Sequence, residues 1–92
     1  MYKVVEKVLI EYVFTMLKGE KKMKGRLCER MGGDATVKYS FAVSHYYRLS
    51  DQAPQPLLPS RTECASREEA ERLLYAYVRA YTGIGVQPNP DY

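Results

Sequence analysis

Apolar and polar side chains alternate along residues 37–49. The odd positions are apolar or aromatic except His45, and the even positions carry Lys38, Ser40, Ala42, Ser44, Tyr46 and Arg48. Because successive side chains of a strand point to opposite faces, this pattern predicts a strand with one buried face and one wet face. Residues 23–31 are patterned as a second strand, and the intervening Gly32-Gly33-Asp34 is typical of a tight turn. We therefore expect an antiparallel hairpin over 23–49.

A helix is expected over about 66–82. Ser66 and Glu69, three residues apart, form a capping box at its start, and Gly83 is the residue type that ends helices. Between them one stripe collects the apolar side chains of Ala70, Leu73, Leu74, Tyr77, Val78 and Tyr81. The sequence thus predicts an α+β fold, in which this helix packs on the apolar face of a small antiparallel sheet.

Residues 2–18 fit two structures. Their polar positions recur every three or four residues, as in an amphipathic helix, while the even positions from Tyr2 to Met16 also form a strand face broken only by Glu6. The many β-branched and aromatic residues favour a strand. A strand of this length is unusual, however, whereas a helix of this length is ordinary. We interpret the segment as a helix and keep an additional strand as the alternative.

The rest of the chain is predicted to be irregular. Residues 50–60 contain Pro54, Pro56 and Pro59, which exclude a helix and favour an extended loop. A short edge strand can follow at 61–64. Pro88 and Pro90 make 84–92 an irregular tail. With 92 residues and no linker, the chain is expected to form one domain.

Composition narrows the function classes. Neither a signal peptide nor a membrane span is expected, since charged residues interrupt the N-terminal apolar run. Two cysteines and one histidine are too few for a zinc site, and no phosphate-binding loop occurs, so we expect no metal, no cofactor and no identifiable small-molecule substrate. A reducing, cytoplasmic setting is the expectation.

No arrangement of residues indicates catalysis. His45 lies on the apolar side of its strand without a nucleophile and an orienting group in the pattern around it, so we interpret it as a structural histidine. A small polar pocket, if one forms, is expected around 44–48. Cys28 lies between Arg26 and Arg30, whose charges would lower the pKa of its thiol, and Cys64 precedes the predicted helix. We expect both cysteines to be inert and the protein not to be an enzyme.

Weak nucleic-acid binding is an alternative function. The segment 18–30 contains six basic and two acidic residues. The candidate contacts to phosphates are Lys21, Lys22, Lys24, Arg26 and Arg30, with Tyr46 as a residue on which a base can stack. With a helix at 2–18, the order of elements resembles a double-stranded-RNA-binding domain. That family carries lysines at the start of its last helix, where this chain has Arg67, Glu68 and Glu69. The resemblance therefore extends to the order of elements and to no motif.

We favour an interaction module. The hairpin followed by the helix start Ser66-Arg67-Glu68-Glu69-Ala70 is similar to several small uncharacterised bacterial domains, and this resemblance implies no catalytic residues. Some large side chains are not needed by the patterned core and suit a protein-binding surface; they are Tyr46, Arg48, Leu57, Leu58 and Tyr75. A small sheet also leaves an edge that a partner strand or a second copy can cover. We expect a protein partner or a homo-oligomer.

Overall fold

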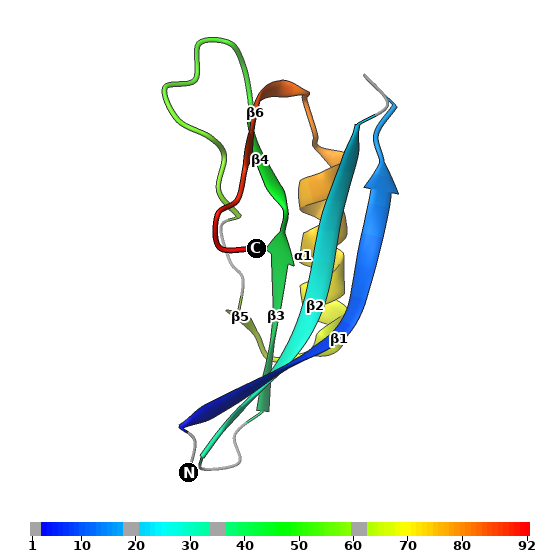
Figure 1. Cartoon of the computed structure of the whole chain (residues 1–92), viewed down its shortest axis with the longest axis vertical. Coiled ribbons are helices and arrows are strands. Elements are labelled where there is room, and N and C mark those ends of the chain that lie inside the picture. Colours follow the sequence, from blue (N-terminus) through cyan, green and yellow to red (C-terminus); the bar gives the residue numbers. More distant parts are fainter. Residues whose placement is uncertain (1–2, 18–20, 34–36, 60–62) are drawn as a thin grey trace.

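The computed structural model describes residues 3–17, 21–33, 37–59 and 63–92. It confirms the α+β fold, in which one helix packs against a small antiparallel sheet (Figure 1). The main sheet has the order β1-β2-β3-β5, with β1 at Val4–Thr15, β2 at Lys22–Gly32, β3 at Val37–Val43 and β5 at Glu63–Cys64. A second sheet pairs β4 (His45–Arg48) with β6 (Ile84–Pro88). The helix α1 spans Arg67–Arg79.

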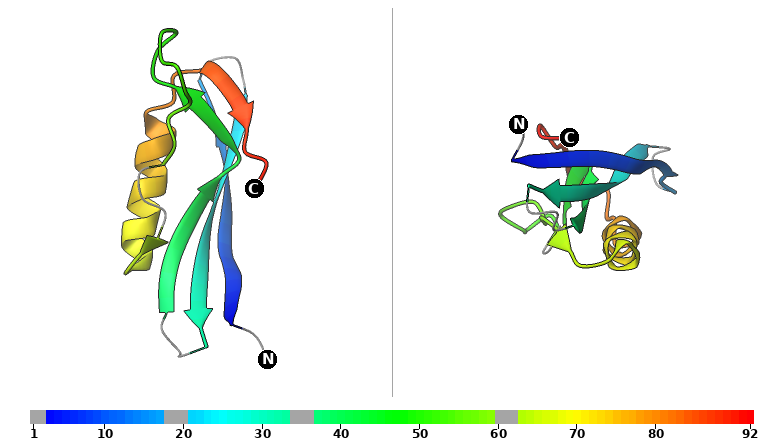
Figure 2. Two further views of the ribbon diagram at one scale, coloured as in Figure 1. Left: turned by 90° about the vertical axis from the view of Figure 1, so that its left-hand side faces the viewer. Right: turned by 90° about the horizontal axis from the view of Figure 1, so that it is seen from below.

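The core lies between α1 and one face of the main sheet. Leu27 of β2 lies opposite Phe41 of β3, and both side chains are buried, as the alternation predicts. Leu74 and Tyr77 of α1 pack into the same cluster, which also contains the fully buried Tyr47. The other face, called here the open face, carries the C-terminal tail on the side away from α1 (Figure 2). The molecule is elongated, measuring 45 × 25 × 21 Å.

The N-terminal segment is a strand, so the preferred helix was wrong and the alternative is confirmed. β1 pairs with β2 along its length, from Val4 opposite Gly32 to Thr15 opposite Lys22. The length that argued against a strand is tolerated because β2 is almost as long. A bulge between Val8 and Ile10 shifts the register. With a strand in place of the first helix, the resemblance to a double-stranded-RNA-binding domain does not hold.

The predicted strand 37–49 is divided at Ser44. The Ser44 N–H donates to the Lys24 carbonyl (2.8 Å), whereas its own carbonyl accepts from the Asn89 N–H (2.8 Å). The chain thereby leaves β2 and continues as β4 beside β6. The asparagine side chain also donates to the Val43 carbonyl (2.8 Å) and stabilises the bend. Alternation survives the break, because both Val43 and Tyr47 are buried.

The start of α1 is as predicted and its end is not. Ser66 is the N-cap and its hydroxyl oxygen accepts from the Glu69 N–H (3.2 Å). The helix ends at Arg79, and Gly83, with φ of 74°, turns the chain into β6. Residues 84–88 therefore form a strand, and the prediction of an irregular tail over 84–92 was wrong there. Pro88 is tolerated as the last strand residue.

The predicted loop 50–60, the turn 32–34 and the edge strand 61–64 lie only partly within the described residues. Residues 50–59 contain no strand, as expected, apart from a bridge between Tyr47 and Leu57. Asp34 of the predicted turn and 61–62 of the predicted edge strand lie outside the described residues. The described end of that run pairs Cys64 with Tyr39 of β3.

Candidate interaction surface

The outer edge of β1 carries an unusual number of exposed apolar side chains. In the part of the chain that the structure describes, β1 pairs with β2 alone, so its other side has no strand neighbour. The apolar side chains on it are between 37% and 55% exposed and are those of Val4, Val5, Val8, Ile10 and Val13. Edge strands are usually short or guarded, because unpaired strands attract other chains. A 12-residue edge with this composition is a candidate docking site for another strand.

The hydrogen bonds at both ends of β1 reveal which backbone groups point outward. The Gly33 N–H donates to the Lys3 carbonyl and the Met16 N–H donates to the Lys21 carbonyl, each at 2.8 Å. Antiparallel ladders alternate between hydrogen-bonded and non-hydrogen-bonded pairs. Counting inward from both ends and allowing for the bulge, the outward-facing backbone groups belong to residues 4, 6, 8, 11, 13 and 15. These residues present their N–H and C=O groups to solvent in one row along the edge.

Charged residues on β1 interrupt this row without covering it. Glu6 lies opposite Arg30 and Glu11 lies opposite Arg26, so both carboxylates face cations of the neighbouring strand. Tyr92 also donates to the Glu11 carboxylate (2.6 Å). These acids are therefore balanced within the molecule. An incoming strand meets apolar side chains and open backbone groups between them.

Three of the residues predicted to contact a partner have structural roles. Tyr46 is half-buried against the core and lies opposite Gln87 of β6. Arg48 donates to the Ala53 carbonyl (3.1 Å) and its aliphatic carbons cover Gly85. The expectation that these side chains stand clear of the core was wrong, because β6, absent from the predicted fold, covers them.

Tyr75 was also expected to be exposed on the wet side of the helix. It is half-buried, and its ring packs against Tyr12 and Phe14 of β1, with centroid distances of 5.5 and 5.9 Å. The strand at 4–15 supplies this contact, so the error follows from the preference for a helix there. Burial raises the pKa of Tyr12 to about 12, and its hydrogen bond to Tyr75 adds to the shift.

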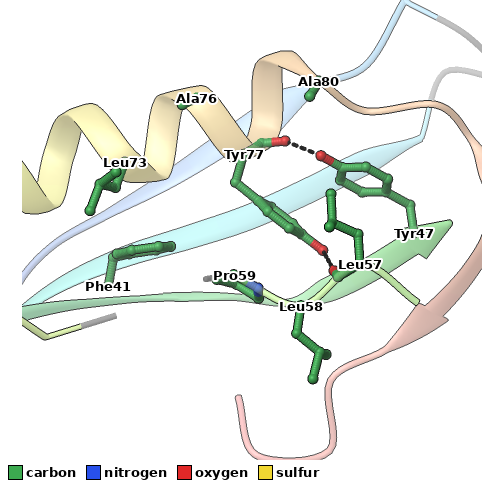
Figure 3. Close-up of a pocket in the computed structure, with 9 residues that line it drawn as sticks. All are labelled: Phe41, Tyr47, Leu57, Leu58, Pro59, Leu73, Ala76, Tyr77 and Ala80. Atoms are coloured by element: carbon green, nitrogen blue, oxygen red, sulfur yellow. Dashed lines mark hydrogen bonds between the residues drawn. The ribbon is translucent and has the colours of Figure 1, made fainter. Parts of the chain in front are cut away.

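Leu57 and Leu58 line an apolar groove between α1 and the loop that follows β4 (Figure 3). The groove has a volume of about 220 Å³, and its other lining residues are Phe41, Tyr47, Pro59, Leu73, Ala76, Tyr77 and Ala80. Leu57 is half-buried and bridges to Tyr47, whereas Leu58 stays 59% exposed. Of the five residues predicted for a partner, Leu58 is therefore the most accessible.

Two tyrosine hydroxyls hold the floor of this groove together. Tyr47 donates to the Tyr77 carbonyl and Tyr77 donates to the Leu57 carbonyl, each at 2.6 Å (Figure 3). Burial raises the pKa of both hydroxyls. Because both donors are used, the groove offers apolar contact rather than hydrogen bonds. It can hold an apolar side chain of a partner.

The predicted basic segment is split by the fold. Arg26 stacks on the Tyr92 ring, 4.3 Å from its centroid, and Arg30 pairs with Glu63 at 3.4 Å. Lys38 shares that carboxylate, and this lysine lowers the pKa of Glu63. Lys21, Lys22 and Lys24 are exposed at the other end of β2. The structure thus leaves three lysines together and places both arginines against acids or rings.

The two cysteines lie on opposite faces of the sheet. Cys64 packs in the core, whereas Cys28 lies on the open face and hydrogen-bonds to Glu6. Burial and this carboxylate raise the pKa of the Cys28 thiol and outweigh Arg26. The expected lowering by neighbouring arginines was therefore wrong, and a thiol with a raised pKa is a poor nucleophile at neutral pH.

The β1 edge was missed because residues 2–18 were assigned to a helix. A signal for it was present in the sequence, since Val4 and Val5, and later Val8, Leu9 and Ile10, are adjacent apolar residues. Adjacent residues of a strand point to opposite faces, so such runs indicate a strand that is apolar on both faces. That pattern is poorly suited to the edge of a small sheet unless something covers it.

No family model, no curated protein and no solved structure matches this chain. Within the described ranges, no helix combines the length and the apolar character needed to cross a membrane. Those ranges also contain no group of three or more His, Cys, Asp or Glu side chains that could hold a metal ion.

Proposed function

We propose that the protein is a small non-enzymatic cytoplasmic module that binds another protein, or a second copy of itself, by adding a strand to β1. The single observation that carries this proposal is the 12-residue edge strand with exposed valines and outward-facing backbone groups. An added strand would pair with these backbone groups, and its side chains would cover the valines on both faces. The Leu57–Leu58 groove is a secondary contact for an apolar side chain.

Other features support a binding role over catalysis. The thiol of Cys28 has a raised pKa, and His45 is engaged by the Ser44 hydroxyl (2.8 Å). The exposed apolar area instead lies on one edge, where covering one of these half-exposed side chains gains roughly 1 kcal/mol, which is about half the value for full burial. The two cysteines lie on opposite faces of the sheet and form no disulfide with each other. Cysteine thiols suit the reducing cytoplasm.

A proline substitution tests strand addition directly. Val8→Pro removes an outward-facing N–H at the bulge, where proline is tolerated, and leaves the ladder to β2 in place. Val8→Ala is the matched control, because it loses the same apolar side chain and keeps the N–H. Self-association is measured by sedimentation velocity over a range of concentrations. We expect the wild type and Val8→Ala to associate and Val8→Pro to remain monomeric.

Binding of another protein is tested with extended peptides. A displayed library of ten-residue peptides is selected on the wild type and counter-selected on Val8→Pro. Selected peptides should protect the amides of residues 4, 6, 8, 11 and 13 from hydrogen exchange. If the wild type is monomeric and no peptide protects these amides, the proposed function is wrong. Unchanged association of Val8→Pro would also refute strand addition.

Weak nucleic-acid binding remains the second candidate, carried by the exposed group Lys21, Lys22 and Lys24. The ion pair of Arg30 and the stacking of Arg26 reduce the charge available for phosphates. Fluorescence anisotropy with single-stranded DNA at 50 and 200 mM salt measures this function. Phosphate binding falls steeply between these salt concentrations, whereas strand addition is nearly indifferent to them.

A further inference from the structure

A second site lies at the corner where the main sheet opens. β3 ends at Val43 opposite Gly25, so the first residues of β2 extend beyond it without a β3 neighbour. A hollow of about 350 Å³ occupies this corner, and its lining residues include Lys22 and Met23 at the start of β2 and Val86 and Pro88 of β6. Its apolar walls are formed by Met16, Met23, Tyr81 and Val86. The expectation of a small pocket near residues 44–48 points to the same corner, since His45 lines it.

The rim of this hollow is basic. Lys21, Lys22 and His45 line it, and none of the described residues that line it is acidic. By contrast, Arg30 and Lys38 at the other end of the sheet both pair with the Glu63 carboxylate. A positive rim above apolar walls attracts a ligand with a negative head group and an apolar body.

The backbone of Lys22 adds a donor to the same site. Lys22 lies opposite Thr15, in the pair next to Met16 and Lys21, whose backbone groups are hydrogen-bonded. By the alternation of the ladder, the Lys22 N–H points away from β1. Farther along β2 that side is occupied by Ser44, which bonds to Lys24, but β3 does not reach Lys22. The N–H therefore points to the side of β2 that β3 does not reach, and Lys22 itself lines the hollow.

The Ser44 hydroxyl orients the imidazole of His45. Its oxygen accepts from the Lys24 N–H (2.8 Å) and lies 2.8 Å from Nδ1 of His45. This contact occupies Nδ1 and leaves Nε2 as the ring nitrogen for a ligand. Binding of an anion at the rim requires the tautomer with the proton on Nε2, in which the Ser44 hydroxyl donates to Nδ1.

We propose that this hollow binds a small amphipathic anion, namely a carboxylate carried on a short alkyl chain or a single ring. The carboxylate is held by the two lysines, the His45 Nε2–H and the Lys22 N–H, and the apolar body packs mainly on Met16, Tyr81 and Val86, since Met23 is only 1% exposed. The size fits, because a cavity of about 150 Å³ holds one benzene ring and this hollow is roughly twice as large. The site is separate from the outer edge of β1, so its occupancy does not depend on the proposed function.

Octanoate and 1-octanol form a matched pair of probes, since they share a chain length and differ in charge. Each is titrated into the full-length protein while methyl and amide chemical shifts are recorded by NMR. We expect octanoate to shift the methyls of Met16 and Met23 and the Lys22 amide in a saturable manner, and octanol to bind at least tenfold more weakly. The double variant Lys21→Gln/Lys22→Gln should weaken octanoate binding about tenfold or more. Its fold should be unchanged, because both side chains are exposed.

Lys38→Gln serves as the control variant, because it removes one positive charge far from the hollow. It should leave octanoate binding within about twofold of the wild type. The inference is overturned if octanoate and octanol bind equally, if the shifts appear at the Leu57–Leu58 groove instead, or if no saturable shift occurs. It is also overturned if the Lys38→Gln and double lysine variants weaken binding equally, since net charge alone would then explain the effect.

Discussion

Gly25 is the position at which the packing of α1 on the sheet is most sensitive to one added methyl group. A Cβ there would lie 2.7 Å from Cδ1 of Leu74 and 3.2 Å from Cε2 of Phe14, well inside the usual carbon contact distance of about 3.5–4.0 Å. Leu74 is fully buried, so its methyl has no open space to enter. Overpacking of this kind costs about 1–3 kcal/mol.

Removing a glycine from a strand returns part of this free energy, about 0.5–1 kcal/mol. We therefore expect Gly25→Ala to lower the free energy of unfolding by about 1–2 kcal/mol, measured by urea denaturation with circular dichroism. In a domain of this size, that corresponds to a decrease in Tm of roughly 4–16 °C.

A double-mutant cycle shows whether the clash is the cause. Leu74→Ala alone should cost about 2–5 kcal/mol, because it leaves a cavity in the core. In the double variant the methyl group added at position 25 enters that cavity, so the two effects should fall short of additivity by more than about 1 kcal/mol. Additive costs, or a Gly25→Ala variant as stable as the wild type, would refute this description of the interface.

Three further predictions concern the tyrosines and the tail. Tyr47→Phe should cost about 1–3 kcal/mol in the free energy of unfolding, because it leaves the Tyr77 carbonyl without its buried donor. The pKa of Tyr12 is raised to about 12, so the protonated hydroxyl stabilises the fold fully below pH 10 and this stabilisation is lost as the pH rises toward 12. When Tm is measured from pH 8 to 12, it should therefore fall less steeply in Tyr12→Phe than in the wild type. Asn89→Ala should cost about 1 kcal/mol and increase hydrogen exchange of the β6 amides, since the bond to the Val43 carbonyl is lost; unchanged exchange would contradict the role given to this side chain.

Local rules were sufficient to predict the hairpin and the start of α1. Alternation identified the buried Leu27, Phe41 and Tyr47, and the capping box placed the helix start at Ser66. These features depend on residues close in sequence. The N-terminal segment was different, because its apolar residues satisfy both periods and pairing with β2 decides between them.

The expected exposure of some candidate residues was wrong where distant segments meet. β6 pairs with β4, from which it is separated by some forty residues of sequence, as in the pair His45 and Pro88. No pattern in neighbouring residues predicts that pairing. Its absence from the expected fold made Tyr46 and Arg48 appear exposed. The hollow near His45 was expected only in outline, because its cationic rim requires the start of β2 to lie near His45 of β4.

The change of partner at Ser44 also orders the assembly of the molecule. β1, β2 and β3 join neighbours along the chain, so they can form a meander with short loops to close. β6 pairs with β4 across a long connection, and it is held by this two-stranded sheet and by the Asn89 side-chain hydrogen bond to the Val43 carbonyl. We therefore expect β6 and the tail to open at a lower free-energy cost than the main sheet. Such an opening would uncover Arg26 and dismantle the corner hollow while leaving the edge of β1 intact, so the two surfaces of this small protein would respond differently to the same fluctuation.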